Sequence, residues 1–439
     1  MYDLEIADGC LYQDGKWNFG NLFIKNGRIE QISSAHLEAK AVYDAAGASV
    51  IPGLIDSHVH LQAQSGRFTS ADSFSSGTAA GALGGVTTVI DFLDEACDVR
   101  EAVRNFELRM SLAKDSAVDY AFHCGVRQPK NVPELVRAML ERGIPSFKVY
   151  TTYKQIGIFS DDLHIAGLMK RTSDRDVMLL SHTENDDLID WSLNQLEDYA
   201  RRRPVLCELS KAVQLAEMTD YYNGVAYMVH VSCGSTVQEL SKRFGDILHR
   251  RFFLESCPHY FLFDDSVYSG KDAALYTMIP PLRSVGEREK LVGAFDEIDT
   301  IGTDHCPYTR AEKQTPDIDA IPMGVNGLGD SFVQMYRLFG DRVIDRFTRN
   351  QAQIHGLYPQ KGILCEGADA DIAIFEKITP RPGFRLYGQS DYSIYAGCEE
   401  TISIRSVLSR GEFVVKDGVL CPHQGKFVCR KLDFAQRNV

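Results

Sequence analysis

The sequence predicts an α/β fold: a (β/α)8 barrel of the TIM type, with a small β-sandwich domain beside it. The middle of the 439-residue chain alternates eight short apolar runs with segments of helical character. Both ends of the chain instead consist of β-type segments separated by tight turns. We therefore expect residues 51–364 to form the barrel, and residues 1–50 and 365–439 to form the β-sandwich together.

The eight apolar runs are the predicted barrel strands. Most of them are followed by a segment of helical character. Residues 131–143 are typical of such a helix, with a capping Asn131, Pro133 in the first turn and Gly143 at the end. The runs are residues 54–60, 86–92, 118–125, 146–150, 177–182, 225–231, 250–256 and 298–304.

The terminal segments are predicted to be antiparallel strands. In residues 22–32, Asn26-Gly27 separates two alternating runs, a pattern typical of a two-residue hairpin turn. Residues 368–375 predict one strand towards the other end of the chain. Residues 402–420 predict three more, broken at Arg410-Gly411 and Asp417-Gly418.

Composition argues against several classes of protein. The formal net charge is −13, so we expect neither nucleic acid nor an anionic membrane as a partner, since both require positive patches. No stretch approaches the roughly 18 apolar residues of a spanning helix, and no signal peptide is predicted. Eleven cysteines without a Cys-x-x-Cys pair predict free thiols and a cytoplasmic location.

Titratable side chains gather at the C-terminal ends of the predicted strands, where the active site of a (β/α)8 barrel lies. The first run ends in His58-Val59-His60, and residues i and i+2 of a strand face the same side. Imidazole and carboxylate groups are the ligands expected of a hydrolytic zinc site or a related divalent ion. The candidate metal-binding residues are His58, His60, Lys148, His182, His230 and Asp304.

Taken singly, these residues have simpler interpretations. A histidine in a strand is more often a hydrogen-bonded core residue, and Lys148 by itself is read as an end-of-strand lysine that reaches solvent. Core histidines have no reason to share one strand end, so the group favours a metal site. We interpret His36, His164, His249, His355 and His423 as surface or structural residues, and leave supporting roles open for His123, His259 and His305.

Seven motifs, in order and spacing, resemble the dihydropyrimidinase/hydantoinase family of the amidohydrolase superfamily. The similarity extends over about residues 3–420. It implies hydrolytic opening of a dihydropyrimidine, a hydantoin or a related cyclic ureide or imide, by attack of a hydroxide held between two metal ions. The motifs are PGLIDSHVHLQ, SFKVYTTY, LLSHTEND, MVHVSCGST, ESCPHYFLFD, PPLR and GTDHCPY.

The resemblance also implies a role for each metal-binding residue. Two divalent ions, zinc in most relatives, are expected. Lys148 matches the family lysine that reacts with carbon dioxide, so its carbamate (N6-carboxylysine) would bridge both ions. Burial lowers the pKa of a lysine and leaves a neutral amine for this reaction. His58 and His60 would hold one ion with Asp304, and His182 and His230 the other.

Catalytic and substrate-binding residues follow from the same resemblance. Asp304 would take a proton from the attacking hydroxide and pass it to the leaving nitrogen, and Tyr153 would donate to the developing oxyanion. Asn326 matches an asparagine that binds the imide edge of the ring. Ile279 stands where many hydantoinases have a serine, in a contact expected to involve the main chain. By family analogy the enzyme is a homotetramer acting on a small-molecule cyclic amide.

The ring substituent and the exact activity stay open. An allantoinase- or dihydroorotase-like activity is the near alternative, but dihydroorotases typically carry arginine at the position of Gln62. Arg67 is read as a solvated loop residue, with binding of an acidic substituent as the alternative. We expect the loops 62–72, 93–98 and 154–162 to contact the substituent, with Phe68, Ile156 and Phe159 lining an apolar pocket.

A catalytically silent interaction protein is the alternative of another class. Such relatives of dihydropyrimidinase keep the fold and lose metal ligands. All six ligand positions are filled by competent residues in this chain, which argues against that alternative.

Overall fold

The computed structural model describes residues 1–315 and 317–434, and its central feature is a nearly closed barrel of eight parallel strands. The two strands at the ends of this sheet approach each other, and a bridge joins Val59 to His305 across the gap. The predicted barrel is confirmed. In sheet order its strands are β15 (Thr300–Ile301), β14 (Phe252–Ser256), β13 (Ala226–Met228), β12 (Met178–His182), β11 (Ser146–Tyr150), β10 (Asp119–Val126), β9 (Val86–Ala96) and β6 (Leu54–Val59).

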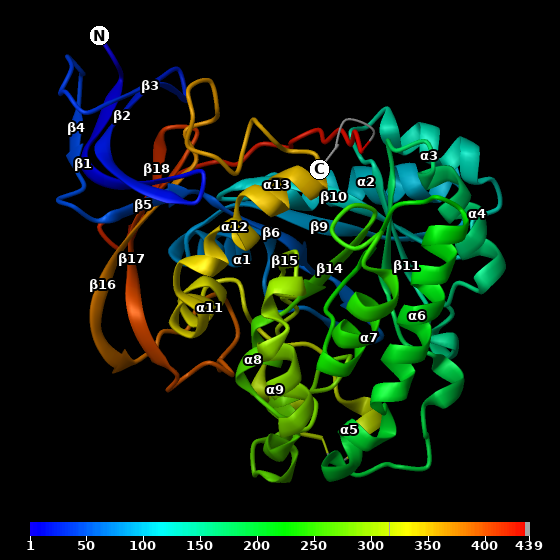
Figure 1. Cartoon of the computed structure of the whole chain (residues 1–439). Coiled ribbons are helices and arrows are strands. Elements are labelled where there is room, and N and C mark those ends of the chain that lie inside the picture. Colours follow the sequence, from blue (N-terminus) through cyan, green and yellow to red (C-terminus); the bar gives the residue numbers. More distant parts are fainter. Residues whose placement is uncertain (316, 435–439) are drawn as a thin grey trace.

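Helices pack around the outside of these strands (Figure 1). The predicted helix after residue 131 is confirmed: the Asn131 side chain accepts a hydrogen bond from the Glu134 amide, and Pro133 lies in the first turn. The helices are α1 (Phe74–Leu83), α2 (Val99–Ala113), α3 (Val132–Leu140), α4 (Asp162–Thr172), α5 (Tyr199–Arg202), α6 (Val205–Tyr221), α7 (Gly234–Phe244), α8 (Pro258–Leu262), α9 (Val285–Gly293), α10 (Arg310–Lys313), α11 (Ser331–Phe339), α12 (Ile344–Phe347) and α13 (Arg349–His355).

The last barrel strand is shorter than the run 298–304 predicts. Strand pairing ends at Ile301, and the next residue, Gly302, lies against the adjacent strand β14. A Cβ atom at Gly302 would lie 2.6 Å from Oε2 of Glu255, so only glycine fits this approach. Asp304 therefore lies beyond the strand, with a left-handed φ of 51°.

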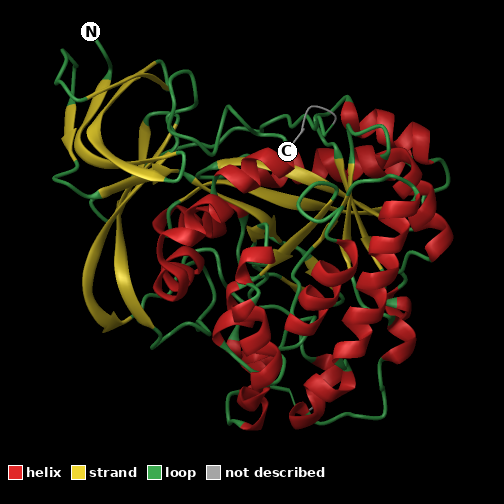
Figure 2. Cartoon of the chain, in the orientation of Figure 1, coloured by secondary structure: helices red, strands yellow, loops and turns green. Residues whose placement is uncertain are grey.

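The terminal segments of the chain join in one mixed sheet of nine strands beside the barrel (Figure 2). The two ends meet where residues 372–375 pair antiparallel with residues 49–52. Asn26 and Gly27, with φ of 52° and 77°, form the predicted tight turn. The strands are β1 (Leu4–Gln13), β2 (Lys16–Lys25), β3 (Arg28–Ser33), β4 (Val42–Asp44), β5 (Ser49–Pro52), β16 (Ile372–Pro382), β17 (Glu399–Ser409), β18 (Glu412–Lys416) and β19 (Val419–Leu420); the short hairpin β7 (Gln64–Ser65) and β8 (Phe68–Thr69) is separate.

A buried ion cluster joins this mixed sheet to the barrel. Nζ of Lys361 lies 2.8 Å from Asp119 at the start of β10, and 3.3 Å and 2.5 Å from Asp369 and Asp371. These two aspartates precede β16, which is why this strand begins at Ile372 rather than at residue 368 as predicted. Lys361 and Arg410, which pairs with Asp119, together offset two of the three negative charges of the cluster.

The C-terminal tail, residues 421–434, leaves the mixed sheet and runs along the N-terminal ends of the barrel strands. Tyr120 hydrogen-bonds to it on both sides, through the carbonyl of Lys426 and the amide of Val428. Leu432 and Phe434 join a buried apolar cluster inside the barrel. We propose the division into 1–50 plus 365–439 and 51–364, in which residues 421–434 of the first unit pack on the barrel and residues 435–439 lie outside the described residues.

Two further findings concern the whole described chain. Within residues 1–315 and 317–434, no helix combines the length and apolar character needed to cross a membrane. All eleven cysteines are free thiols, as predicted.

Candidate metal centre and active site

The six candidate metal-binding residues line one cavity of about 620 Å3 at the C-terminal ends of the barrel strands. His58 and His60 lie at the end of β6, and Nε2 of each is 3.2 Å from Oδ1 of Asp304. The imidazole of His230, which follows β13, lies 5.4 Å from that of His58 and 4.5 Å from that of His182. Parallel strands thus bring residues from distant parts of the chain to one point.

The donor atoms fit a divalent metal ion. Ligand atoms of His58, His230 and Asp304 all lie within 4.8 Å of one another. Nε2 of His58 and Nδ1 of His230 are buried without a hydrogen bond of good geometry, an arrangement that is costly unless another partner binds them. Burial also lowers the pKa of both imidazoles, which keeps them neutral and able to bind a metal.

Glu255 on β14 orients two of these histidines, although the sequence analysis did not single it out. Its Oε1 lies 2.6 Å from Nδ1 of His58 and accepts a hydrogen bond of 3.1 Å from the His230 amide. The Tyr227 hydroxyl donates to Oε2 at 2.8 Å. A carboxylate behind a metal-binding histidine sets the nitrogen that faces the metal. In the sequence, the one sign of this role is that an acidic residue stands near the end of the predicted strand 250–256.

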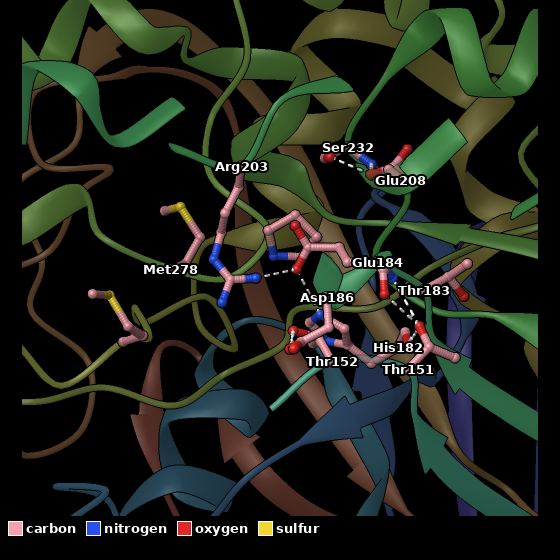
Figure 3. A network of polar contacts seen from close by, with 12 residues as sticks. Thr151, Thr152, His182, Thr183, Glu184, Asp186, Arg203, Glu208, Ser232 and Met278 are labelled. Atoms are coloured by element: carbon pink, nitrogen blue, oxygen red, sulfur yellow. Dashed lines mark hydrogen bonds and ion pairs between the residues drawn. The ribbon is translucent and has the colours of Figure 1, made fainter. Parts of the chain in front are cut away.

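Glu184 has the corresponding place behind His182 (Figure 3). Its Oε2 lies 2.9 Å from Nε2 of His182 and accepts a hydrogen bond of 2.7 Å from Arg203. Arg283 lies further out, 4.0 Å from the other carboxylate oxygen. Burial raises the pKa of Glu184, but Arg203 and His182 outweigh it and hold this pKa at about 2. Glu184 is therefore a fixed anion that orients the imidazole.

Lys148 is fully buried, and loss of water around the amine disfavours its charged form. Its Nζ faces aromatic rings, 4.9 Å from the centre of Phe92 and 5.2 Å from that of Tyr150. Among residues 1–315 and 317–434, no carboxylate lies within ion-pair distance of it. Burial lowers the pKa of Lys148 to about 8, against the opposing attraction of Asp304 and Glu255. A neutral amine is accordingly accessible near physiological pH.

Three residues of the site hold a left-handed backbone that is unfavourable for residues other than glycine. The φ angles are 41° at His230, 51° at Asp304 and 71° at Tyr153. Each costs about 1–3 kcal/mol, and such costs concentrate where function requires a side chain to point in one direction.

Comparisons with known proteins agree with this geometry. Residues 49–414 match the Amidohydrolase family. The chain belongs to the amidohydrolase family. It is 32% identical to the D-phenylhydantoinase of Escherichia coli O81 (strain ED1a), over 97% of this chain and 96% of the relative. Among solved structures it is similar to the D-hydantoinase of Bacillus sp. AR9 (28% identity, TM-score 0.93, 98% and 99% covered) and to the dihydropyrimidinase of Brevibacillus agri NCHU1002 (26% identity, TM-score 0.91, 98% and 99% covered).

The chain is a hydantoinase- and dihydropyrimidinase-like amidohydrolase. Two of its three predicted substrate-binding residues lie in the cavity wall. Tyr153 and Ile279 line the cavity. Burial raises the pKa of Tyr153 well above its usual value, so its hydroxyl stays protonated. Asn326 lies outside the lining: its amide donates to Asp330 at 3.2 Å and to Ser393 at 2.8 Å, and its oxygen accepts from the Ile394 amide.

The loops of the amidohydrolase form a more polar wall than expected. Ile156 lines the cavity as predicted, but Phe68 and Phe159 are not among the lining residues. The ring of Phe68 lies instead beneath the guanidinium of Arg67, which also lies outside the lining, and Phe159 packs under Lys154. The wall includes polar groups that the sequence analysis did not single out, namely Asp94, Glu95, Arg109, Arg202, Arg203 and Asp319.

Two of the histidines that adjoin the candidate metal site, His123 and His305, hold barrel segments together, whereas both ring nitrogens of His259 are buried without a hydrogen-bond partner among the described residues. His123 bonds the Ser146 hydroxyl at 2.7 Å and the Ser57 carbonyl at 3.0 Å. His305 lies 3.0 Å from Asp72 through Nε2, and its Nδ1 accepts from the Gly327 amide. Both nitrogens of each ring are used, so neither imidazole is available as a ligand.

Proposed function

We propose that this amidohydrolase opens the ring of a cyclic amide, a dihydropyrimidine, a hydantoin or a related ureide or imide, by hydrolysis of a ring C–N bond. The observation that carries the proposal is the convergence of four histidines, Lys148 and Asp304 on one cavity. The similarity to a D-phenylhydantoinase and to a dihydropyrimidinase supports the class of ring.

The metal centre of the proposal uses the residues named above. His58, His60 and Asp304 would hold one divalent ion, and His182 and His230 a second. A neutral Lys148 amine would form a bond to carbon dioxide, lose a proton and become an anionic carbamate between the two ions. When bound, two such ions, zinc in our proposal, would supply a hydroxide at neutral pH and polarise the ring carbonyl.

The chain's own groups would manage the proton and the oxyanion. Burial alone would raise the pKa of Asp304, but the imidazoles of His58 and His60 hold it below its usual range. Asp304 is thus an anion in the resting site and can take the proton of the attacking water, then deliver it to the ring nitrogen as the C–N bond breaks. Tyr153, a protonated phenol in the wall, would donate to the carbonyl oxygen as negative charge develops.

Substrate contacts, assembly and location complete the proposal. Ile279 would contact the ring through its main chain. Asn326, whose side chain is occupied by Asp330 and Ser393, has only main-chain groups left for that role. By analogy with relatives we propose a homotetramer, and the eleven free thiols suit the reducing cytoplasm.

A ring-opening screen tests the proposed function. The purified protein, with its metal content measured, is incubated with hydantoin, dihydrouracil, allantoin and succinimide, and products are identified by mass spectrometry. We expect opening of at least one ring that is lost in His60→Ala and kept in His36→Ala, because His36 is an exposed residue of the loop that follows β3. A folded protein that holds no divalent metal, and stays inactive with zinc and bicarbonate, would refute the proposal.

A further inference from the structure

The guanidinium groups of the cavity wall are already paired with carboxylates. These pairs satisfy the positive charge of the wall, so an acidic substrate group would have to compete with a carboxylate of the protein for any of them. The pairs are Arg109 with Asp94 at 3.4 Å, Arg202 with Asp319 at 2.5 Å, and Arg203 with Glu184 at 2.7 Å.

Glu95, near the end of β9, is a wall carboxylate without such a pair. It lines the cavity together with His60, Lys148 and Tyr150. In the described part of the chain, no lysine, arginine or histidine nitrogen lies within 4.0 Å of its carboxylate. An ionised carboxylate accepts about four hydrogen bonds, so most of its capacity is left for the cavity.

The rest of the wall near the loops suits an aliphatic chain. Ile156, Ile158, Trp191 and Ile318 line the same cavity. Carbon atoms of a substrate can pack against these side chains, while a polar group at the end of the substituent requires a partner. Burial raises the pKa of Glu95, as expected of a carboxylate that lacks a cation.

We propose that Glu95 binds a nitrogen-bearing substituent of the ring, so that the enzyme acts on cyclic amides whose substituent donates N–H hydrogen bonds, such as an alkylammonium or a ureido group. This inference rests on the proposed function and narrows its substrate class. An aryl substituent would bury Glu95 without a donor, and an acidic one would place two like charges together. Both outcomes are unfavourable, because the substituent would displace water from the carboxylate without replacing its hydrogen bonds or would repel its charge.

A matched pair of substrates tests this assignment. In 5-(4-aminobutyl)hydantoin and 5-pentylhydantoin an ammonium replaces a methyl group of similar size. We expect the enzyme to prefer the ammonium compound by roughly tenfold or more in kcat/KM, since a charge-assisted hydrogen bond contributes that much. Glu95→Gln should abolish the preference at unchanged metal content. Glu107→Gln, which removes an exposed carboxylate of α2, should keep it.

Allantoin and 5-propylhydantoin form a second pair, in which a neutral ureido group replaces an alkyl chain. The same direction of preference is expected, smaller in size, and lost again in Glu95→Gln.

Other outcomes separate the inference from the proposed function. Equal kcat/KM for both members of each pair would overturn the inference and leave the function standing. A Glu95→Gln enzyme that loses metal, or slows equally on all substrates, would show that Glu95 supports the metal centre instead. If no hydantoin is opened, calorimetry tests the inference instead: wild type should bind 5-(4-aminobutyl)hydantoin roughly tenfold more tightly than 5-pentylhydantoin, and Glu95→Gln should not. The proposed function itself fails only if no ring of the screen is opened.

Discussion

Oε1 of Glu255 lies 2.6 Å from Nδ1 of His58, and this contact directs Nε2 of His58 towards Asp304. The same oxygen accepts a hydrogen bond from the main-chain amide of His230. One buried carboxylate therefore positions two residues from separate strands. Its removal should affect the metal centre even though Glu255 is not proposed to touch a metal.

Glu255→Gln should lower metal affinity by roughly 10- to 100-fold, because the amide keeps the shape but not the charge that holds the imidazole. The measurement is metal content after dialysis against graded chelator concentrations, with circular dichroism to verify folding. Glu412→Gln, an exposed residue of β18, is the control. Unchanged metal affinity would contradict this role.

Lys148→Ala should lose the metal pair and the activity, because it removes the amine proposed to form the carbamate between the two ions. A short carboxylic acid such as propionate should restore part of both by occupying the space of the carbamate. Metal analysis and ring-opening rates with and without propionate are the measurements, and Lys130→Ala, at an exposed position, is the control. Full activity of Lys148→Ala would show that the lysine does not bridge metals.

Asn326→Ala should reduce stability by about 1–3 kcal/mol, since it leaves the Ile394 amide without its acceptor and removes one of the donors to Asp330, which keeps the Ser393 hydroxyl. KM should change little, because the side chain does not line the cavity. Denaturant unfolding and steady-state kinetics measure the two effects. A raised KM with unaltered stability would instead indicate a direct contact between this side chain and the ring.

His249→Asn should change how stability depends on pH. The hydrogen bond to Asp299, 2.8 Å long, raises the pKa of His249 to about 9 despite the opposing effect of burial. Because this pKa lies above the value of about 6.5 in the unfolded chain, the stabilisation is complete below about pH 6.5 and disappears as pH rises through about 9.

Thermal midpoints of both proteins at about pH 6 and about pH 9.5 test this prediction, since the window between the two pKa values lies inside that range. Wild type should lose more stability than His249→Asn on going to the higher pH. Asparagine tolerates the left-handed φ of 61° at this position, so backbone strain does not obscure the comparison. Parallel pH profiles in the two proteins would contradict the prediction.

Much of the candidate site could be predicted because it depends on strand ends. His58 and His60 share a face through the two-residue period of a strand, and parallel strands bring their C-terminal ends together. Glu255 and Glu184 were missed, because an acidic residue next to a strand end does not reveal that it lies behind an imidazole. Asn326 matched a family position, yet only its contacts show that its amide is occupied.

The amino-acid sequence by itself determined the alternation of strands and helices, the tight turns of the terminal sheet, the family, and the six candidate metal-binding residues that line one cavity. These depend on local patterns, in which spacing along the chain sets the direction of side chains. Tertiary structure alone decided which charges of the cavity wall are paired. Arg202 pairs with Asp319 and Arg109 with Asp94, whereas no cation of the described residues lies within ion-pair distance of Glu95, because pairing depends on packing between loops far apart in sequence.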